Sequence, residues 1–272
     1  MKYSKKNKIA LITGAGGLMG KYHAEALAEV GYNLVLIDLN IAKLLKLKKL
    51  LSKKFKKLKF YCFNCDITSE KQVKNLKKNL DENKLFISCL VNNADINPKM
   101  ISSNSKIKSN FEDYKLDILK REISVGIFGT FNCSKLFGSA MAKKNDGIII
   151  NVSSDLGVIA PDQRIYDKSE NILNVKNFKP ISYSISKHAL HGITKYLSTY
   201  WAHKKIRVNT LVMGAVFNNQ SRTLVKNLQK RIPLGRMAKK NEYKKAIQFL
   251  ANKENSYMTG QKLIVDGGRT IW

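Results

Sequence analysis

The stretch KIALITGAGGLMGKYHAEALAEVGYNLVLID, residues 8–38, decides the fold of this chain. It opens with an apolar run at residues 9–12 that is too short for a helix, so we expect a buried strand there. A glycine-rich turn follows, and then a segment whose apolar residues recur at helical spacing. Gly31 can end that helix in a left-handed conformation. A second apolar strand leads to Asp38.

This order of strand, glycine turn, helix, strand and acidic residue is typical of dinucleotide-binding βαβ units. Glycines let the backbone approach a pyrophosphate, and a helix N-terminus offers it free N–H groups and the positive end of a dipole. Asp38 can accept hydrogen bonds from both hydroxyls of an adenosine ribose. A 2′-phosphate would meet like charge there, so the sequence predicts NAD rather than NADP as the cofactor.

Strands and helices are expected to alternate along the rest of the 272 residues. The expected strands lie at residues 9–12, 33–37, 59–63, 86–91, 147–152, 206–212 and 262–265. The expected helices lie at about residues 18–30, between residue 41 and the strand at 59, and at about residues 71–80, 115–142, 183–203, 221–229 and 241–251. The pattern predicts a single α/β domain over residues 1–272, with one doubly wound parallel sheet and helices on both faces.

The chain is strongly basic, with a formal net charge of +29. Only seven of its 49 basic residues are Arg, the residue best suited to reading phosphates and guanine, so we expect no specific nucleic-acid partner. Lysines are densest over residues 41–60, where Leu residues keep helical spacing. This favours a helix that covers the sheet and exposes a lysine face; the alternative is a basic amphipathic helix on an anionic membrane.

Several other classes of protein are disfavoured by composition. No apolar run is long enough to span a membrane, and the N-terminal apolar run is only a strand long, which argues against a signal peptide. Cys62 and Cys65 form a C-x-x-C without a second pair, so we interpret them as core or strand-end thiols. The four His residues lack metal-ligand spacing. We expect a cytoplasmic protein without a metal site.

The chain resembles the short-chain dehydrogenase/reductase family over nearly all its length. Residues 13–20, TGAGGLMG, are similar to the family's T-G-x-x-x-G-x-G turn, with Leu18 in place of the middle glycine. Residues 92–95, NNAD, resemble its N-N-A-G motif, with Asp95 in place of glycine. The resemblance implies a Rossmann-type fold. It also implies cofactor contacts from Gly14, Gly17, Leu18, Met19, Asp38, Asp66, Ile67, Asn93, Tyr183, Lys187 and Val216.

The resemblance also implies three catalytic residues. Residues 183–187, YSISK, match the family's Y-x-x-x-K motif, and residues 151–154, NVSS, match the strand that delivers the catalytic serine, Ser154. A Tyr183 hydroxyl could exchange a proton with the substrate, although its ordinary pKa of about 10 is high. Lys187 lies one helical turn further, where its charge would stabilise the phenolate and its ammonium could hold the nicotinamide ribose. Ser154 would hydrogen-bond the substrate oxygen.

Some positions depart from the family pattern. Gly126 stands where the family often has an asparagine, which leaves the corresponding proton relay to water or to another group. Met213-Gly214 replaces the usual P-G, while Val216 would still present its backbone to the nicotinamide carboxamide. The separation of Ser154 from Tyr183 is long for the family and predicts an inserted loop at about residues 155–180.

That loop is rich in hydrogen-bonding groups, which suit a polyhydroxylated substrate. Its Arg164 could pair with a carboxylate or phosphate if the substrate carries one. The alternative is a solvated insertion without substrate contact. The loop and the C-terminal end, residues 266–272, resemble a subgroup of oxidoreductases from flagellin-modification and surface-polysaccharide gene clusters. Members of that subgroup are thought to serve amino-sugar or nonulosonic-acid synthesis.

The predicted activity is therefore hydride transfer between nicotinamide and a CH–OH or C=O carbon of a sugar-like substrate. The alternatives are a 3-oxoacyl-type reductase and a non-catalytic NAD-binding scaffold. Family members are commonly tetramers, so we expect a homotetramer that assembles through the helices at 115–142 and 183–203 and the last strand.

Overall fold

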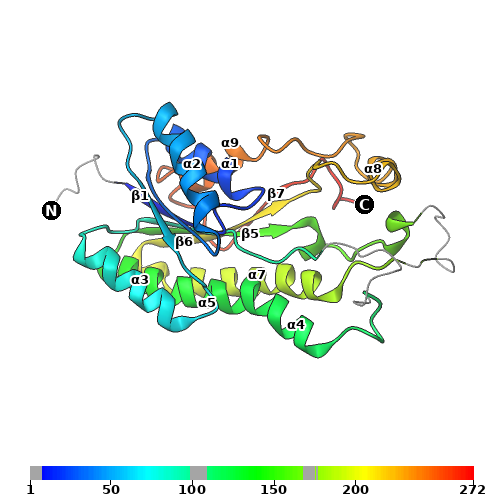
Figure 1. Cartoon of the computed structure of the whole chain (residues 1–272), viewed down its shortest axis with the longest axis horizontal. Helices are drawn as coiled ribbons and strands as arrows, with labels where there is room; N and C mark the ends of the chain where they lie inside the picture. The colour runs from blue at the N-terminus through cyan, green and yellow to red at the C-terminus, as the bar shows by residue number, and fades with distance from the viewer. Residues whose placement is uncertain (1–7, 99–108, 168–174, 176) are drawn as a thin grey trace.

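A computed structural model of the chain describes residues 8–98, 109–167, 175 and 177–272 (Figure 1). Seven strands form one parallel sheet in the order β3-β2-β1-β4-β5-β6-β7. The strands are β1 Ile9–Thr13, β2 Asn33–Asp38, β3 Phe60–Asn64, β4 Cys89–Asn92, β5 Gly147–Ser154, β6 Ile206–Met213 and β7 Lys262–Val265. The predicted doubly wound parallel sheet is confirmed.

Helices cover both faces of this sheet (Figure 1). The helices on one face are α1 Gly20–Glu29, α2 Ile41–Lys54 and α9 Lys244–Ala251. The helices on the other face are α3 Glu70–Glu82, α7 Ile181–Tyr200 and the long helix 116–144. Because the central strands are buried from both sides, β1, β5 and β6 consist of buried residues throughout.

The expected helix at 115–142 forms as one helical stretch with two π-helical segments. Its parts are α4 Leu116–Ile123, η1 Ser124–Gly129, α5 Thr130–Cys133, η2 Ser134–Gly138 and α6 Ser139–Lys144. Both π-helical segments contain buried glycines, which bring this helix close to its neighbours. Among the described residues, no helix has both the length and the apolar character needed to cross a membrane.

The lysine-rich helix α2 buries Leu44, Leu47 and Leu51 and ends at Lys54. Its lysines are all exposed. The prediction of a sheet-covering helix with a solvated lysine face is confirmed.

The strand order reverses between β1 and β4, so the helices that follow these two strands cover opposite faces of the sheet. Open α/β sheets bind ligands at such a reversal. The glycine turn follows β1, and residues 93–95 follow β4. The two segments are in close contact, since a Cβ on Gly14 would lie 2.9 Å from the Cα of Ala94.

The chain between β5 and α7 forms two short 3₁₀ turns, η3 Asp155–Gly157 and η4 Gln163–Tyr166. Ile165 packs against Leu228, which belongs to α8 Arg222–Gln229, and against Ile232 and Met237. Residues 168–174 and 176 of the predicted insertion, Lys168 among them, lie outside the described residues.

Candidate active site

The glycine turn exposes the N-terminus of α1 to an incoming anion. Gly14 has φ +61°, which favours glycine, and a Cβ on Gly20 would lie 2.4 Å from the Gly14 carbonyl oxygen. Met19 caps α1 without a side-chain hydrogen bond, and the first turn holds no acidic residue. The backbone N–H groups of this turn and the helix dipole therefore suit a phosphate.

Asp38 lies at the end of β2 beside this turn. Its Oδ2 accepts a 3.0 Å hydrogen bond from Gly16 N, and its Oδ1 accepts one of 3.0 Å from Asn40 N. A Cβ on Gly16 would lie 3.1 Å from Asp38 Oδ2, so glycine permits this close approach. Asp38, one of the predicted cofactor residues, therefore lies beside the turn. Gly16 was not among those predicted residues, but its N–H group fixes the position of the Asp38 carboxylate.

Asn93 holds the glycine turn against β4. Its Nδ2 donates to the carbonyls of Thr13, at 2.9 Å, and Gly14, at 3.1 Å. The Thr13 hydroxyl in turn accepts from the backbone N–H groups of Asn93 and Ala94, at 3.0 and 2.9 Å. Asn93 is thus placed to shape the turn that would hold the cofactor.

The remaining predicted cofactor residues lie along the same edge of the sheet. Asp66 follows β3 and accepts hydrogen bonds from the backbone and hydroxyl of Thr68 at 2.9 and 2.7 Å. Ile67 is buried against Gly129, whose added Cβ would lie 2.4 Å from it. Val216 follows β6 and forms a parallel bridge with a residue further along the chain. Leu18 and Met19, in the turn itself, are exposed and half-buried respectively.

Ser154, Tyr183 and Lys187 come together at this edge. Ser154 ends β5, and the other two residues lie one turn apart on α7. Lys187 Nζ is 5.5 Å from the centroid of the Tyr183 ring and donates a 2.9 Å hydrogen bond to the carbonyl of Val152 on β5. The spacing predicted from the sequence therefore does place the three side chains in one cluster.

Burial raises the pKa of Tyr183 above its ordinary value. The Lys187 charge and a hydrogen bond with Ser154 act in the opposite direction, and Asp95 and Asp155 add to the increase. The contribution of Lys187 thus has the expected sign. Burial outweighs it, however, so the surroundings as a whole raise the pKa of Tyr183.

Ser154 is joined to a buried ion pair that the sequence did not indicate. Its Oγ donates a 2.6 Å hydrogen bond to Asp155 Oδ1, and Asp155 Oδ2 lies 2.9 Å from Arg269 Nε. The Arg269 and Asp155 side chains are only 4% and 7% exposed. The only signal in the sequence is that this basic residue directly follows residues 266–268, DGG.

Two more charged side chains, Asp95 and Lys179, face Tyr183 and Lys187. Asp95 Oδ2 is 3.0 Å from Lys187 Nζ. Lys179 Nζ lies 4.3 Å from the Tyr183 ring centroid and donates to the carbonyl of Pro98 at 3.3 Å. Burial lowers the pKa of Lys179 to about 8. Lys179 was not among the predicted site residues, and Asp95 was noted only as a departure from a motif.

Arg164 is paired within its own loop. Its Nε and Nη2 donate to the two oxygens of Asp162 at 2.8 and 3.0 Å, and Arg231 Nε lies 2.6 Å from the same carboxylate. The Arg164 hydrogen bond and Arg231 hold the pKa of Asp162 well below its ordinary value. Arg164 is therefore positioned by Asp162, with about half of its side chain exposed.

A family model described as enoyl-(acyl carrier protein) reductase matches residues 14–270 of this chain, nearly its whole length. The chain belongs to the short-chain dehydrogenase/reductase family of oxidoreductases. An uncharacterized short-chain type dehydrogenase/reductase of Sinorhizobium fredii is 28% identical over 96% of this chain, which spans only 43% of that protein.

Other relatives in the short-chain dehydrogenase/reductase family match from end to end. The 3-oxoacyl-(acyl-carrier-protein) reductase FabG of Thermotoga maritima is 29% identical over 98% of this chain and 99% of its own length. The 2-dehydro-3-deoxy-D-gluconate 5-dehydrogenase of Bacillus subtilis is 28% identical over 98% of this chain and 96% of its own length.

Solved structures of family members superpose closely on this chain. A gluconate 5-dehydrogenase from Burkholderia cenocepacia, in complex with NADP and tartrate, has a TM-score of 0.83 and 25% identity, over 97% of this chain and 96% of that one. An NAD⁺-bound xylitol dehydrogenase also has a TM-score of 0.83, with 26% identity, over 97% of this chain and all of that one.

Among the described residues of this family member, no three His, Cys, Asp or Glu side chains lie close enough together to hold a metal ion. All four cysteines are free thiols. Cys65, Cys89 and Cys133 are buried in the core and Cys62 is half-buried on β3, as expected for core or strand-end thiols.

Proposed function

We propose that this family member is an NAD-dependent oxidoreductase that transfers a hydride between nicotinamide and a CH–OH or C=O carbon of a polyhydroxylated substrate. The observation that carries the proposal is the cluster of Ser154, Tyr183 and Lys187 at the sheet edge that also holds the glycine turn and Asp38. A non-catalytic scaffold would have no need of these three side chains together.

The bound nicotinamide would supply or accept the hydride. At the substrate oxygen, the Tyr183 hydroxyl would give a proton during carbonyl reduction, and the Tyr183 phenolate would take one during alcohol oxidation. The Lys187 charge lowers the free energy of the phenolate form. Ser154 Oγ hydrogen-bonds the same oxygen and limits the build-up of charge in the transition state.

The choice of NAD rests on Asp38. Its carboxylate beside the turn would accept the two adenosine ribose hydroxyls, whereas a 2′-phosphate would meet a negative charge. The solved relatives include one bound to NAD⁺ and one bound to NADP, so the preference within the family follows local residues rather than the fold. Gly14, Gly17, Leu18 and Met19 would lie against the pyrophosphate, with the other predicted cofactor residues along the same edge.

A sugar-like substrate is supported by the polar loop before α7 and by relatives named for gluconate, 2-dehydro-3-deoxy-D-gluconate and xylitol. Lys179, beside the Tyr183 ring, would offer a positive charge to a carboxylate on such a substrate. Within this proposal we place the enzyme in surface-glycan or nonulosonic-acid synthesis. Its four free thiols agree with a reducing, cytoplasmic location.

A second candidate is a 3-oxoacyl reductase, because the FabG relative matches over its whole length. A spectrophotometric assay separates the two candidates. Purified protein is given NAD or NADP with polyols and sugar acids, and NADH or NADPH with keto-sugars and an acetoacetyl thioester. Turnover of the polyhydroxylated compounds supports the proposal. Turnover of the thioester alone would favour the second candidate, and no turnover of any substrate would support a scaffold.

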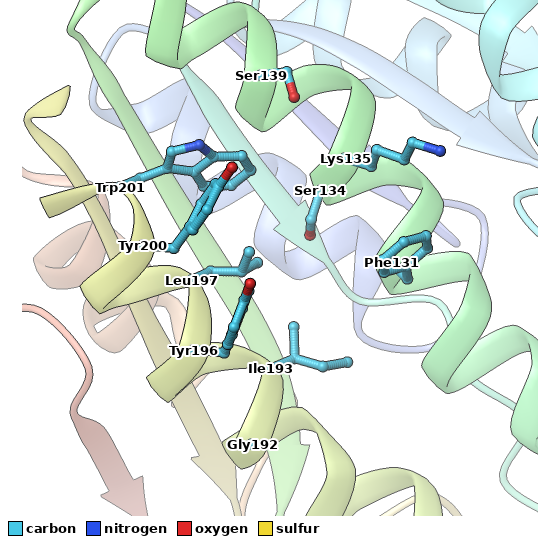
Figure 2. Close-up of a pocket in the computed structure, with 10 residues that line it drawn as sticks. All are labelled: Phe131, Ser134, Lys135, Ser139, Gly192, Ile193, Tyr196, Leu197, Tyr200 and Trp201. Atoms are coloured by element: carbon cyan, nitrogen blue, oxygen red, sulfur yellow. The ribbon is translucent and has the colours of Figure 1, made fainter.

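We further propose that the chain forms a homo-oligomer, a tetramer by family likeness. A pocket of about 450 Å³ lies between α7 and the helix at 130–139. Figure 2 shows Tyr196 and Tyr200 projecting from α7 toward the helix that carries Phe131. These three aromatic side chains are more than half exposed, which is unusual for a contiguous surface without a partner. Light scattering of the protein and of Tyr196→Asp tests this, because a charge in the interface should dissociate it.

A further inference from the structure

Two residues that depart from the family motifs lie against each other. Asp95 stands at the glycine position of N-N-A-G, and Gly126 stands where an asparagine is common. A Cβ on Gly126 would lie 2.7 Å from Asp95 Oδ1 and 3.0 Å from both Cβ and Oγ of Ser186. Real Cβ atoms do not approach other atoms to 2.7 Å, so the Asp95 carboxylate occupies space that a side chain at position 126 would need.

The Asp95 carboxylate is held in a single orientation. Its Oδ1 accepts a 2.9 Å hydrogen bond from the backbone N–H of Ile96, and its Oδ2 lies 3.0 Å from Lys187 Nζ. The Asp95 and Lys187 side chains are 7% and 6% exposed. Lys187 also donates to the Val152 carbonyl. The ammonium therefore has a hydrogen-bond acceptor in the Val152 carbonyl and an ion-pair partner in Asp95.

Other charged and titratable groups also face this pair. Tyr183 faces the pair from α7. Lys179 faces it from the segment before α7, and the positive charges of Lys179 and Lys187 repel each other. Glu122 on α4 and Asp155 after β5 contribute negative charge around Lys179. His23 on α1 is buried, which lowers its pKa to about 4 and leaves it neutral near pH 7. Asp95 is thus the one carboxylate within ion-pair distance of Lys187 among the described residues.

We propose that Asp95 is a positioning residue for Lys187 and that Gly126 provides the space that Asp95 needs. The inference rests on the proposed function, in which Lys187 stabilises the Tyr183 phenolate. Asp95 keeps the ammonium charged and aimed at Val152 and Tyr183, while its own charge opposes formation of the phenolate.

The test is a cycle of four proteins: the parent, Asp95→Gly, Gly126→Asn and the double variant, which restores the common family residues at both positions. We expect Asp95→Gly to lower kcat at least tenfold. We expect Gly126→Asn alone to be as damaging, because its side chain meets the carboxylate. The double variant should recover most of the lost activity. Losses that simply multiply in the double variant would overturn the proposal.

Two further measurements test the packing of the pair and the positioning role in turn. Thermal unfolding without cofactor should show the same pattern, with a lower Tm for Gly126→Asn and recovery on adding Asp95→Gly. The pH profile of kcat/KM for alcohol oxidation should move to lower pH in Asp95→Asn, since a charge that opposes the phenolate is gone. An unmoved profile would overturn the proposal. Asp146→Asn, which breaks a pair with Lys253 far from the site, is the matched control and should move neither quantity.

The failure of this inference can be told apart from failure of the proposed function. If the parent turns over CH–OH substrates and Tyr183→Phe does not, the proposed function stands whatever the Asp95 variants do. Asp95→Gly with parental kcat and an additive cycle would then remove the positioning role alone. A parent without oxidoreductase activity would remove both.

Discussion

The hydroxyl of Ser154 donates a 2.6 Å hydrogen bond to Oδ1 of Asp155, the next residue in the chain. The Ser154 oxygen also accepts a 3.3 Å hydrogen bond from the backbone N–H of Leu156. To donate to the substrate oxygen, as proposed above, the Ser154 hydroxyl would have to rotate away from Asp155. The carboxylate is in turn held by Arg269, close to the C-terminus of the chain. The position of the serine thus depends on a buried ion pair.

Replacing Arg269 should destabilise the protein. Arg269→Met leaves the buried Asp155 carboxylate without its charged partner, so we expect the free energy of unfolding to fall by about 3 kcal/mol. Adding Asp155→Asn should restore part of that loss, because no buried charge then remains. Urea unfolding measures both changes. A loss no larger than that of Arg236→Met, which breaks an exposed pair with Glu242, would contradict this expectation.

Removing the hydroxyl of Tyr183 should slow turnover greatly but leave cofactor binding intact. Tyr183→Phe removes only the group that exchanges the proton, so we expect kcat to fall by about 10²–10⁴-fold. The dissociation constant for NADH, measured by fluorescence, should stay within about threefold of the parent value, since the glycine turn and Asp38 are untouched. Turnover within tenfold of the parent would remove Tyr183 from its assigned role.

The two reaction directions should respond oppositely to pH. Burial raises the pKa of Tyr183, so its protonated form persists into the alkaline range. Carbonyl reduction uses that form and should lose kcat/KM only as the pH rises through the tyrosine pKa. Alcohol oxidation uses the phenolate and should gain over the same range. Lys187→Met should move the oxidation profile to still higher pH, because Lys187 lowers the tyrosine pKa; a shift to lower pH would contradict this.

Replacing Asp38 should relax the cofactor preference. Asp38→Ala removes the ribose acceptor and the charge that repels a 2′-phosphate, so KM for NAD should rise about tenfold and KM for NADP should fall. The turn would also lose the hydrogen bond from Gly16 to the carboxylate. Asp38→Asn, which can keep a hydrogen bond but not the charge, is the matched control. A parent enzyme that already prefers NADP would show that the ribose argument is wrong.

Replacing Arg164 tests whether the loop before α7 contacts substrate. Arg164→Ala should lower kcat/KM for an acidic sugar at least fivefold and leave NAD affinity unchanged, because the loop loses a positive charge on a side chain that is about half exposed. Arg231→Ala also removes a partner of Asp162 but leaves Arg164 in place, so it controls for loosening of the loop. Equal effects of the two variants would assign Arg164 a structural role.

The regular elements were predictable from the periodicity of the sequence, and the family resemblance implied the cluster of Ser154, Tyr183 and Lys187. Apolar residues at every second position predict strands, and apolar residues at every third to fourth position predict helices. A glycine turn between a strand and a helix predicts a dinucleotide-binding site. A tyrosine and a lysine four residues apart on one helix must lie on the same face. The lysine face of α2 follows from the same reasoning.

The tertiary structure alone decided what surrounds these groups. Asp95 meets Lys187 and Gly126, and Arg269 meets Asp155, only because separate strands end side by side at one edge of the sheet. No local pattern records such contacts, since each joins residues far apart in the chain. The pKa of Tyr183 also depends on the tertiary structure. The lysine four residues along predicts that this pKa is lowered, but burial by the folded chain determines the net direction.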